Sequence, residues 1–357
     1  MGAAADITNA SNEYQNTNFI TLASVVSALS VVILHSNGIY WTFSSTERYW
    51  KTANVIDAVF YFAVPVFFMI SASTLLNYNK RYGLGTYFKK RIVKTFIPYV
   101  FWSLFGLAFQ IYYLESIDGG EVTLSYILNG LGNGSLVSKY WFFPALFSVY
   151  LSIPLFAAVE EKRRKEVFTY LSVAGFLICS LWPLLRNVLD ISASTSVTIG
   201  VASGYLFYIA TGYLLSHYEV RPWLRKLLYI FGIIGLLIHI VGTYQVSMAA
   251  GSVVRTYKGY TNVPSIMYSV AVFLFFCQHG NRIMEIDWVS KITKFLSKYT
   301  FSLYLLHWYI LEIMIKVFSI DKRWIIYRLF AVIPTTLVVV GITFAVRKIP
   351  LLKKLLP

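Results

Sequence analysis

The chain has 357 residues, of which 57% are hydrophobic, 18% aromatic and only 13% charged. A soluble protein of this length needs more charged residues to cover its surface, so the composition excludes an ordinary water-soluble protein and indicates a membrane protein. The formal net charge of +15 does not call for a nucleic acid partner, because basic residues of membrane proteins gather in loops that face an anionic inner leaflet.

The apolar runs predict an all-α integral membrane protein, because backbone polar groups in hydrocarbon must be satisfied within helices. We expect a short polar cytoplasmic tail at 1–17, a single transmembrane domain at 18–350 and a basic cytoplasmic C-terminal tail at 351–357. About ten transmembrane helices are predicted, at 18–37, 53–77, 95–114, 140–159, 167–186, 198–216, 224–246, 262–278, 298–319 and 323–346.

The distribution of Lys and Arg predicts the orientation of these helices. The loops after the even-numbered segments, together with the C-terminal tail, hold 21 of these residues, whereas the loops after the odd-numbered segments hold 8. Cytoplasmic loops carry the excess of positive charge, so we predict that both termini are cytoplasmic.

His35 stands near the outer end of the first segment, in the run VVILHSN. One interpretation is a structural histidine at the membrane interface. The other is a general base, because a buried imidazole stays neutral and can accept a proton. Ionisable groups within membranes are functional in some proteins and structural in others, so His35 alone leaves both interpretations open.

The second segment is interrupted by Pro65, which leaves the backbone carbonyl near Tyr61 without its helical hydrogen bond. Asp57 lies early in the same segment and is a candidate for a cavity lining. Trp141 opens the fourth segment, where it fits either an interfacial aromatic belt or a cavity wall.

Lys89, Lys90, Arg91 and Lys94 precede the third segment, at its cytoplasmic end. The simpler explanation is that they set the topology. The functional alternative is a phosphate clamp, in which arginine binds two oxygens at once and lysines act as point charges.

His307 lies in the middle of the ninth segment, and Glu312 and Lys316 follow it on the same chain. The last two are four residues apart, so they share a helix face and can pair. These groups form either a structural polar seam or the wall of a polar cavity. The spacing of the histidines, cysteines and acids predicts no metal site.

Five stretches together resemble the acyltransferase-3 family of membrane acyltransferases, with the O-acetyltransferase of enterobacterial common antigen as the nearest type. They are VVILHSN, VIDAVFYFAVPVFFMISASTLL, YFKKRIVKTFIPYVFWS, KYWFFPALFSVYLSIPLF and KYTFSLYLLHWYIL, in that order along most of the chain. The resemblance implies a multi-pass protein of a bacterial plasma (inner) membrane, with about ten helices.

The resemblance also implies roles for particular residues. His35 matches the essential histidine of the family's first helix, and His307 matches a recurrent late histidine. Lys90, Arg91 and Lys94 match a basic motif that faces the acyl donor. Family members move an acyl group, usually acetyl, from cytoplasmic acyl-CoA to a hydroxyl of a surface or lipid-linked glycan. The expected partners are therefore the bilayer, acyl-CoA (acetyl-CoA), a glycan or glycolipid acceptor and possible further copies of the chain.

Two positions depart from the family pattern. The family has arginine eleven residues before the helix-1 histidine, where this chain has Ser24, and Ser-Gly at the end of helix 2, where it has Ser71 and Ala72. Serine cannot supply the missing charge. Three functions stay open: an O-acyltransferase, an exporter of glycans or small solutes on the same fold, and a membrane partner subunit without chemistry.

Overall fold

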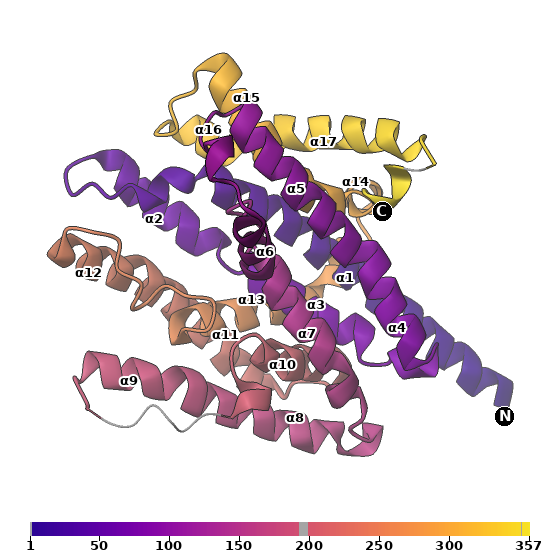
Figure 1. Ribbon diagram of the computed structural model, residues 1–357. Coiled ribbons are helices and arrows are strands. Elements are labelled where there is room, and N and C mark those ends of the chain that lie inside the picture. The colour runs from indigo at the N-terminus through magenta and orange to yellow at the C-terminus, as the bar shows by residue number, and fades with distance from the viewer. Residues whose placement is uncertain (1, 193–198, 351) are drawn as a thin grey trace.

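The computed structural model describes residues 2–192, 199–350 and 352–357, and for residues 2–17 only the backbone (Figure 1). The described residues form helices and loops without a β-strand. The α-helices are α1 (Gly2–Ser36), α2 (Arg48–Phe60), α3 (Ala63–Leu75), α4 (Leu84–Arg91), α5 (Ile97–Tyr112), α6 (Leu124–Asn133), α7 (Phe142–Ala157), α8 (Glu161–Phe176), α9 (Trp182–Val188), α10 (Leu206–His217), α11 (Pro222–Leu237), α12 (Thr243–Ala250), α13 (Val263–Ile283), α14 (Asp287–Ser297), α15 (Thr300–Phe318), α16 (Ile325–Phe330) and α17 (Val332–Arg347).

The all-α integral membrane fold is confirmed. Within the described residues, 7 helical runs are long and apolar enough to span a bilayer, and α7 and α17 are shorter apolar helices. Together with α10, which lies in the sixth expected segment, they correspond to the ten segments predicted from the sequence. The cytoplasmic placement of the termini stays a prediction. In Figure 1 both ends of the chain lie on the right of the view, near α4 and the end of α17.

The apolar part of α1 lies at the centre of the fold. It packs against α3, α13 and α15, and more than half of its residues are buried, as in the runs Arg48–Lys80, Val263–Ile283 and Thr300–Phe318. The other long runs, such as Pro222–Ala250, bury a third of their residues or fewer. Those outer runs therefore present their apolar side chains to lipid, whereas α1 is enclosed by protein.

Pro65 interrupts the second segment about one turn before its own position, as expected for a proline in a helix. The regular α-helix is interrupted at Tyr61 and Phe62, between α2 and α3, although both residues keep right-handed helical backbone angles. Proline cannot donate the hydrogen bond that would satisfy the carbonyl four residues earlier, which belongs to Tyr61. Tyr61, which lies at this break, lines a cavity described below.

Three of the outer runs contain a turn of π-helix, at Ile92–Phe96, Leu177–Leu181 and Ile238–Gly242. The first two lie directly before a helical segment whose second residue is proline, Pro98 or Pro183. The missing N–H and the bulk of the proline ring disturb the preceding turn, which explains the widening there. The third π-turn has no proline at that position.

Both predicted tails contain ordered elements or contacts: the first is helical, and the second packs against the transmembrane domain. α1 begins at Gly2, so a helical backbone extends through the expected polar tail 1–17. At the other end, the indole N–H of Trp102 donates a hydrogen bond of 3.0 Å to the carbonyl of Leu355, and Leu356 is buried. The final residues of the chain therefore pack against the transmembrane domain.

Arg328 fastens the end of α1 to α2 and α16. Its guanidinium donates to the side-chain oxygen of Asn37 at 3.3 Å, to the carbonyl of Tyr49 at 3.1 Å and to the hydroxyl of Thr52 at 2.7 Å. The hydroxyl of Ser36 in turn donates to the carbonyl of Arg328 at 2.7 Å. Because Arg328 and Asn37 are buried, each lost bond would leave a polar group without water, which is costly.

This network generates a stability prediction. Asn37→Leu removes the acceptor of Arg328 and the donor to the carbonyl of Ala53, which lies 2.8 Å away. We expect a loss of stability of roughly 1–3 kcal/mol, because buried partners are left unsatisfied, measured as a lower melting temperature in detergent. Asn129→Leu is the matched control, since Asn129 is exposed on α6 and bonds only to Ser125 among the described residues. Equal melting temperatures for the two variants would contradict the prediction.

Candidate active site

His35 and His307 form a hydrogen-bonded pair although 272 positions separate them in the sequence. Nδ1 of His35 lies 2.6 Å from Nε2 of His307, and the two ring planes differ by 12°. Nδ1 of His307 lies 3.0 Å from the carbonyl oxygen of Leu303. That carbonyl can only accept, so the proton of a neutral His307 sits on Nδ1 and its Nε2 must accept from His35. A neutral His35 then keeps Nε2 unprotonated.

A cavity of about 440 Å³ opens against His35. It is amphipathic, because both charged and aromatic side chains line it. The charged and titratable residues that line it are His35, Asp57, Lys139, Arg255 and Lys258, and the aromatic ones are Trp41, Tyr61, Trp141, Tyr205 and Tyr260. A pocket of this size with a few convergent polar groups is the usual form of a small-molecule site.

Stacked rings form one wall of the cavity. The rings of Tyr61 and Tyr260 are parallel within 6° with centroids 4.1 Å apart, and Trp141 stacks on Tyr260 at 5.3 Å. The tryptophan predicted as either belt or cavity wall therefore lines the cavity. Such a column offers flat apolar faces edged by hydroxyl and indole donors. It can hold a ligand that has both apolar faces and polar edges.

Asp57 pairs with Lys258 at the side of this cavity. The two side chains make a salt bridge in which both are buried, with the lysine side chain 1% exposed. The ammonium also lies over the rings of Tyr40 and Tyr61, at 4.4 and 4.2 Å from their centroids. Cation–π contacts and the carboxylate together compensate for burying this charge.

The loop that carries Lys139 and Trp141 is tied to the helix of His307. The hydroxyl of Tyr304 donates to the carbonyl of Lys139 at 2.8 Å, and that of Tyr140 donates to the carbonyl of Leu305 at 2.6 Å. Gly134, which ends α6 with φ +66°, lets the chain turn where a side chain would meet the carbonyl oxygen of Tyr140 at 2.6 Å. The loop thus positions a cation and an aromatic ring beside the histidine pair.

The basic cluster before α5 lies apart from the histidine pair, and none of its members lines the cavity. Lys94 is exposed and falls within the π-turn Ile92–Phe96. The ammonium of Lys90 lies 3.8 Å from the ring centroid of Tyr82, and the guanidinium of Arg91 lies 5.3 Å from that of Tyr150. Within the described part of the chain, the buried Nε of Arg91 has no hydrogen-bond partner.

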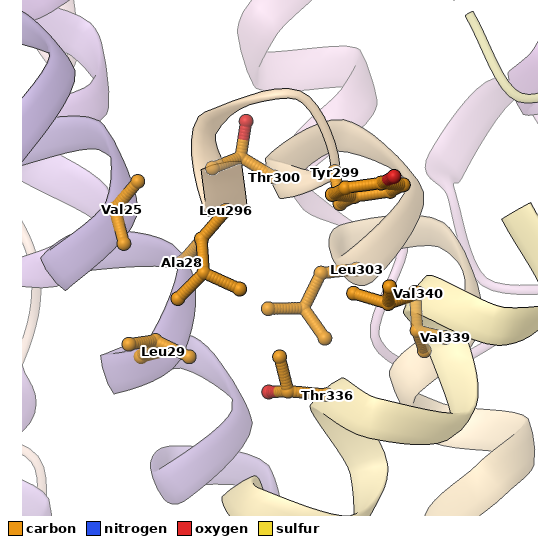
Figure 2. Close-up of a pocket in the computed structure, with 10 residues that line it drawn as sticks. All are labelled: Val25, Ala28, Leu29, Leu296, Tyr299, Thr300, Leu303, Thr336, Val339 and Val340. Carbon is orange, nitrogen blue, oxygen red and sulfur yellow. The ribbon is translucent and has the colours of Figure 1, made fainter. Parts of the chain in front are cut away.

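Ser24 occupies the place of the family arginine in α1 and does not line the cavity. One turn further along α1, Ala28 and Leu29 line a narrow crevice whose other lining residues come from α14, α15 and α17, among them Leu303 and Val340 (Figure 2). The void there measures about 10 Å³, roughly the space of one water molecule. The face of α1 around Ala28, about two turns before His35, is therefore apolar and leaves little free space.

Two further predicted site residues, Ser71 and Glu312, make their polar contacts outside the cavity of His35. The hydroxyl of Ser71 donates to the carbonyl of Phe67, one turn earlier in α3, at 3.0 Å. Glu312 pairs with Lys322 at 3.7 Å. The expected pairing of Glu312 with Lys316 is wrong, because the Lys316 ammonium turns to the carbonyl and ring of Tyr113. Neither Ser71 nor Glu312 lines the cavity of His35.

Three cavity cations had no signal in the sequence beyond their position in loops between predicted helices: Lys139, Arg255 and Lys258. The loop of the last two is organised by Asn262, whose amide donates to the carbonyls of Arg255 and Thr256 at 3.0 Å each. Only this folding brings the loop over the end of α1. Within the described residues, no group of three or more His, Cys, Asp or Glu is placed to hold a metal ion.

The comparisons with known proteins identify the family of this chain. A family model described as an acyltransferase domain matches residues 18–345. The "Putative membrane-bound acyltransferase YfiQ" of Bacillus subtilis (strain 168) is 25% identical over 316 residues, covering 82% of this chain and 81% of that protein. No solved structure matches the chain. The family match covers nearly all of the transmembrane domain, and this chain belongs to the acyltransferase-3 family of membrane acyltransferases.

Proposed function

We propose that this membrane acyltransferase moves an acyl group, acetyl in the simplest case, from cytoplasmic acyl-CoA to a hydroxyl of a cell-surface or lipid-linked glycan. The observation that carries the proposal is the histidine pair. Its hydrogen bonds leave Nε2 of His35 as an acceptor, beside a cavity large enough for a sugar ring. The chain also belongs to a family of membrane acyltransferases. An O-acyltransferase of the plasma membrane needs such a base.

The reaction divides into proton transfer and acyl transfer. Nε2 of His35 accepts the proton of the acceptor hydroxyl as its oxygen attacks the thioester carbonyl. The carbon–sulfur bond then breaks, an ester forms, and the proton passes from His35 to the departing CoA thiolate. His307 orients the His35 ring through the nitrogen–nitrogen hydrogen bond of 2.6 Å and stabilises the imidazolium that forms, as the third member of a catalytic triad does.

The acyl donor is assigned to the basic cluster of α4 and the π-turn. CoA carries several phosphate charges, and Lys90, Arg91 and Lys94 offer donors for them. The buried Nε of Arg91, which has no hydrogen-bond partner within the described residues, is a donor that a phosphate oxygen would satisfy. The long pantetheine arm would then carry the thioester towards His35.

The cavity argues against a partner subunit without chemistry, because such a subunit is expected to have a filled interior at His35. An exporter on the same fold would also need a cavity. Acyl transfer requires the His35 base, whereas export does not. The variant His35→Ala therefore separates the two functions.

His35→Ala is expected to lower the rate of acyl transfer by about 10²- to 10⁴-fold, since the general base is lost. The measurement is CoA thiol release from acetyl-CoA by the purified protein supplied with cell-envelope glycans. His279→Ala is the matched control, because His279 is exposed on α13 and lies outside the cavity. Glycan export that persists in His35→Ala, without acyl transfer by the unmodified protein, would favour the exporter.

His307→Ala should also lower the rate, because His35 loses the partner that fixes its ring and tautomer. His307→Gln keeps an acceptor oxygen near the position of Nε2 and should recover part of the rate. The comparison is made on kcat at saturating acetyl-CoA. Equal rates for the two variants would argue against an orienting role of His307.

Neutralising the basic cluster tests the donor site. In Lys90→Gln/Arg91→Gln/Lys94→Gln, calorimetric titration with acetyl-CoA should show binding weakened by about tenfold or more, because charge-assisted hydrogen bonds to phosphate are lost. Lys291→Gln/Lys294→Gln/Lys298→Gln is the control, since it removes the same charge from exposed positions in and just after α14. Equal binding by both variants would place the donor elsewhere.

A further inference from the structure

The cavity beside His35 holds more positive charge than its own acid can neutralise. Its lining includes three cations, Lys139, Arg255 and Lys258, and one carboxylate, Asp57. Asp57 is engaged by Lys258, and both side chains are buried. Two positive charges are therefore left over in a space that also contains the proposed catalytic base.

Lys139 is half-buried and faces the cavity. Among the described residues Lys139 makes no ion pair. Glu312 is the carboxylate that interacts electrostatically with it, but Glu312 forms its salt bridge with Lys322, at 3.7 Å. Burial lowers the pKa of Lys139, because the charged form is less well solvated there than in water. An anion in the cavity would remove that penalty.

Arg255 supplies the second charge, from the loop between α12 and α13. It is exposed, and its guanidinium lies 5.7 Å from the ring centroid of Trp41. Within the described part of the chain no carboxylate forms a salt bridge with it. The guanidinium fork is free to bind two oxygens of one anionic group, which is the geometry that carboxylates and phosphates fit.

We propose that the acceptor in this cavity is an acidic sugar, whose carboxylate or phosphate is held by Lys139 and Arg255 while its hydroxyl faces His35. This inference rests on the proposed function and adds the chemical class of its acceptor. The aromatic side chains that line the cavity, among them Trp41, Trp141 and Tyr205, provide apolar surface for the sugar ring. The two cations then fix which hydroxyl approaches the base.

The test compares matched sugars. Acyl transfer from acetyl-CoA is measured to methyl β-glucuronide, to glucose 1-phosphate and to the neutral methyl β-glucoside. We expect kcat/KM for an acidic sugar to exceed that for the glucoside by about tenfold or more, because a hydrogen bond to a charged group is stronger than one to a neutral group. The two acidic sugars distinguish carboxylate from phosphate. Equal values for all three sugars would overturn the proposal.

The variants assign the preference to the cations. Lys139→Gln and Arg255→Gln should each reduce the ratio of kcat/KM for the acidic sugar to that for the neutral sugar by about tenfold. Lys139→Arg should retain most of this ratio. Lys51→Gln is the control and should leave the ratio unchanged, because Lys51 is exposed on α2. The increase in KM is expected to be larger for the acidic sugar than for acetyl-CoA. If KM for acetyl-CoA rises instead, these cations bind the phosphates of the donor, and the proposal is wrong.

A binding measurement separates this proposal from the proposed function. Trp41 and Trp141 line the cavity, so methyl β-glucuronide should change the tryptophan fluorescence of the intact protein without acetyl-CoA. If acyl transfer is absent but the glucuronide binds more tightly than the glucoside, and Lys139→Gln removes the difference, the acidic-ligand site stands and the enzymatic function fails. If the two sugars bind equally, the acidic-ligand site fails.

Discussion

The hydrogen bonds at the end of α1 are the interaction on which the site depends. Ser36 and Asn37 follow His35 directly, in a place where burial denies them water, and Arg328 supplies the partners they need. Because buried polar groups must be paired, this network holds the end of α1 in one position. The neighbouring imidazole is therefore presented to α15 and to the cavity in a fixed direction. A catalytic base requires such positioning.

The surroundings of His35 differ on its two sides. On one side, His307 and the carbonyl of Leu303 form a chain of hydrogen bonds that fixes where the protons sit. On the other side, the cavity collects charges and rings from α1, α2 and several connecting segments. The histidine pair, which is the proposed base and its orienting group, thus comes from packed helices, whereas the other groups that line the cavity come mainly from loops. Rigid helices give precision, and loops allow the ligand-binding groups to vary.

The sequence predicted well those features that depend on local chemistry. The apolar segments correspond to helices because hydrophobic length and backbone hydrogen bonding decide a membrane helix locally. The break at Tyr61 follows from Pro65. His35, Asp57 and Trp141 were singled out because polar or amphipathic groups at membrane depth are unusual, and all three line one cavity. Glu312 was expected to pair with Lys316, but Lys322 from the following loop is its partner.

The sequence by itself determined that this protein is a helical membrane protein of the acyltransferase-3 type, because composition, apolar length and motif order are properties of the chain. The tertiary structure alone decided that His35 meets His307 and that Lys258 neutralises Asp57. It also decided that Lys139 and Arg255 line the same cavity without a salt bridge to any described residue. The reason is physical. Pairing between charges depends on the distance between them in space, and residues more than 200 positions apart come within bonding distance only when the helices pack.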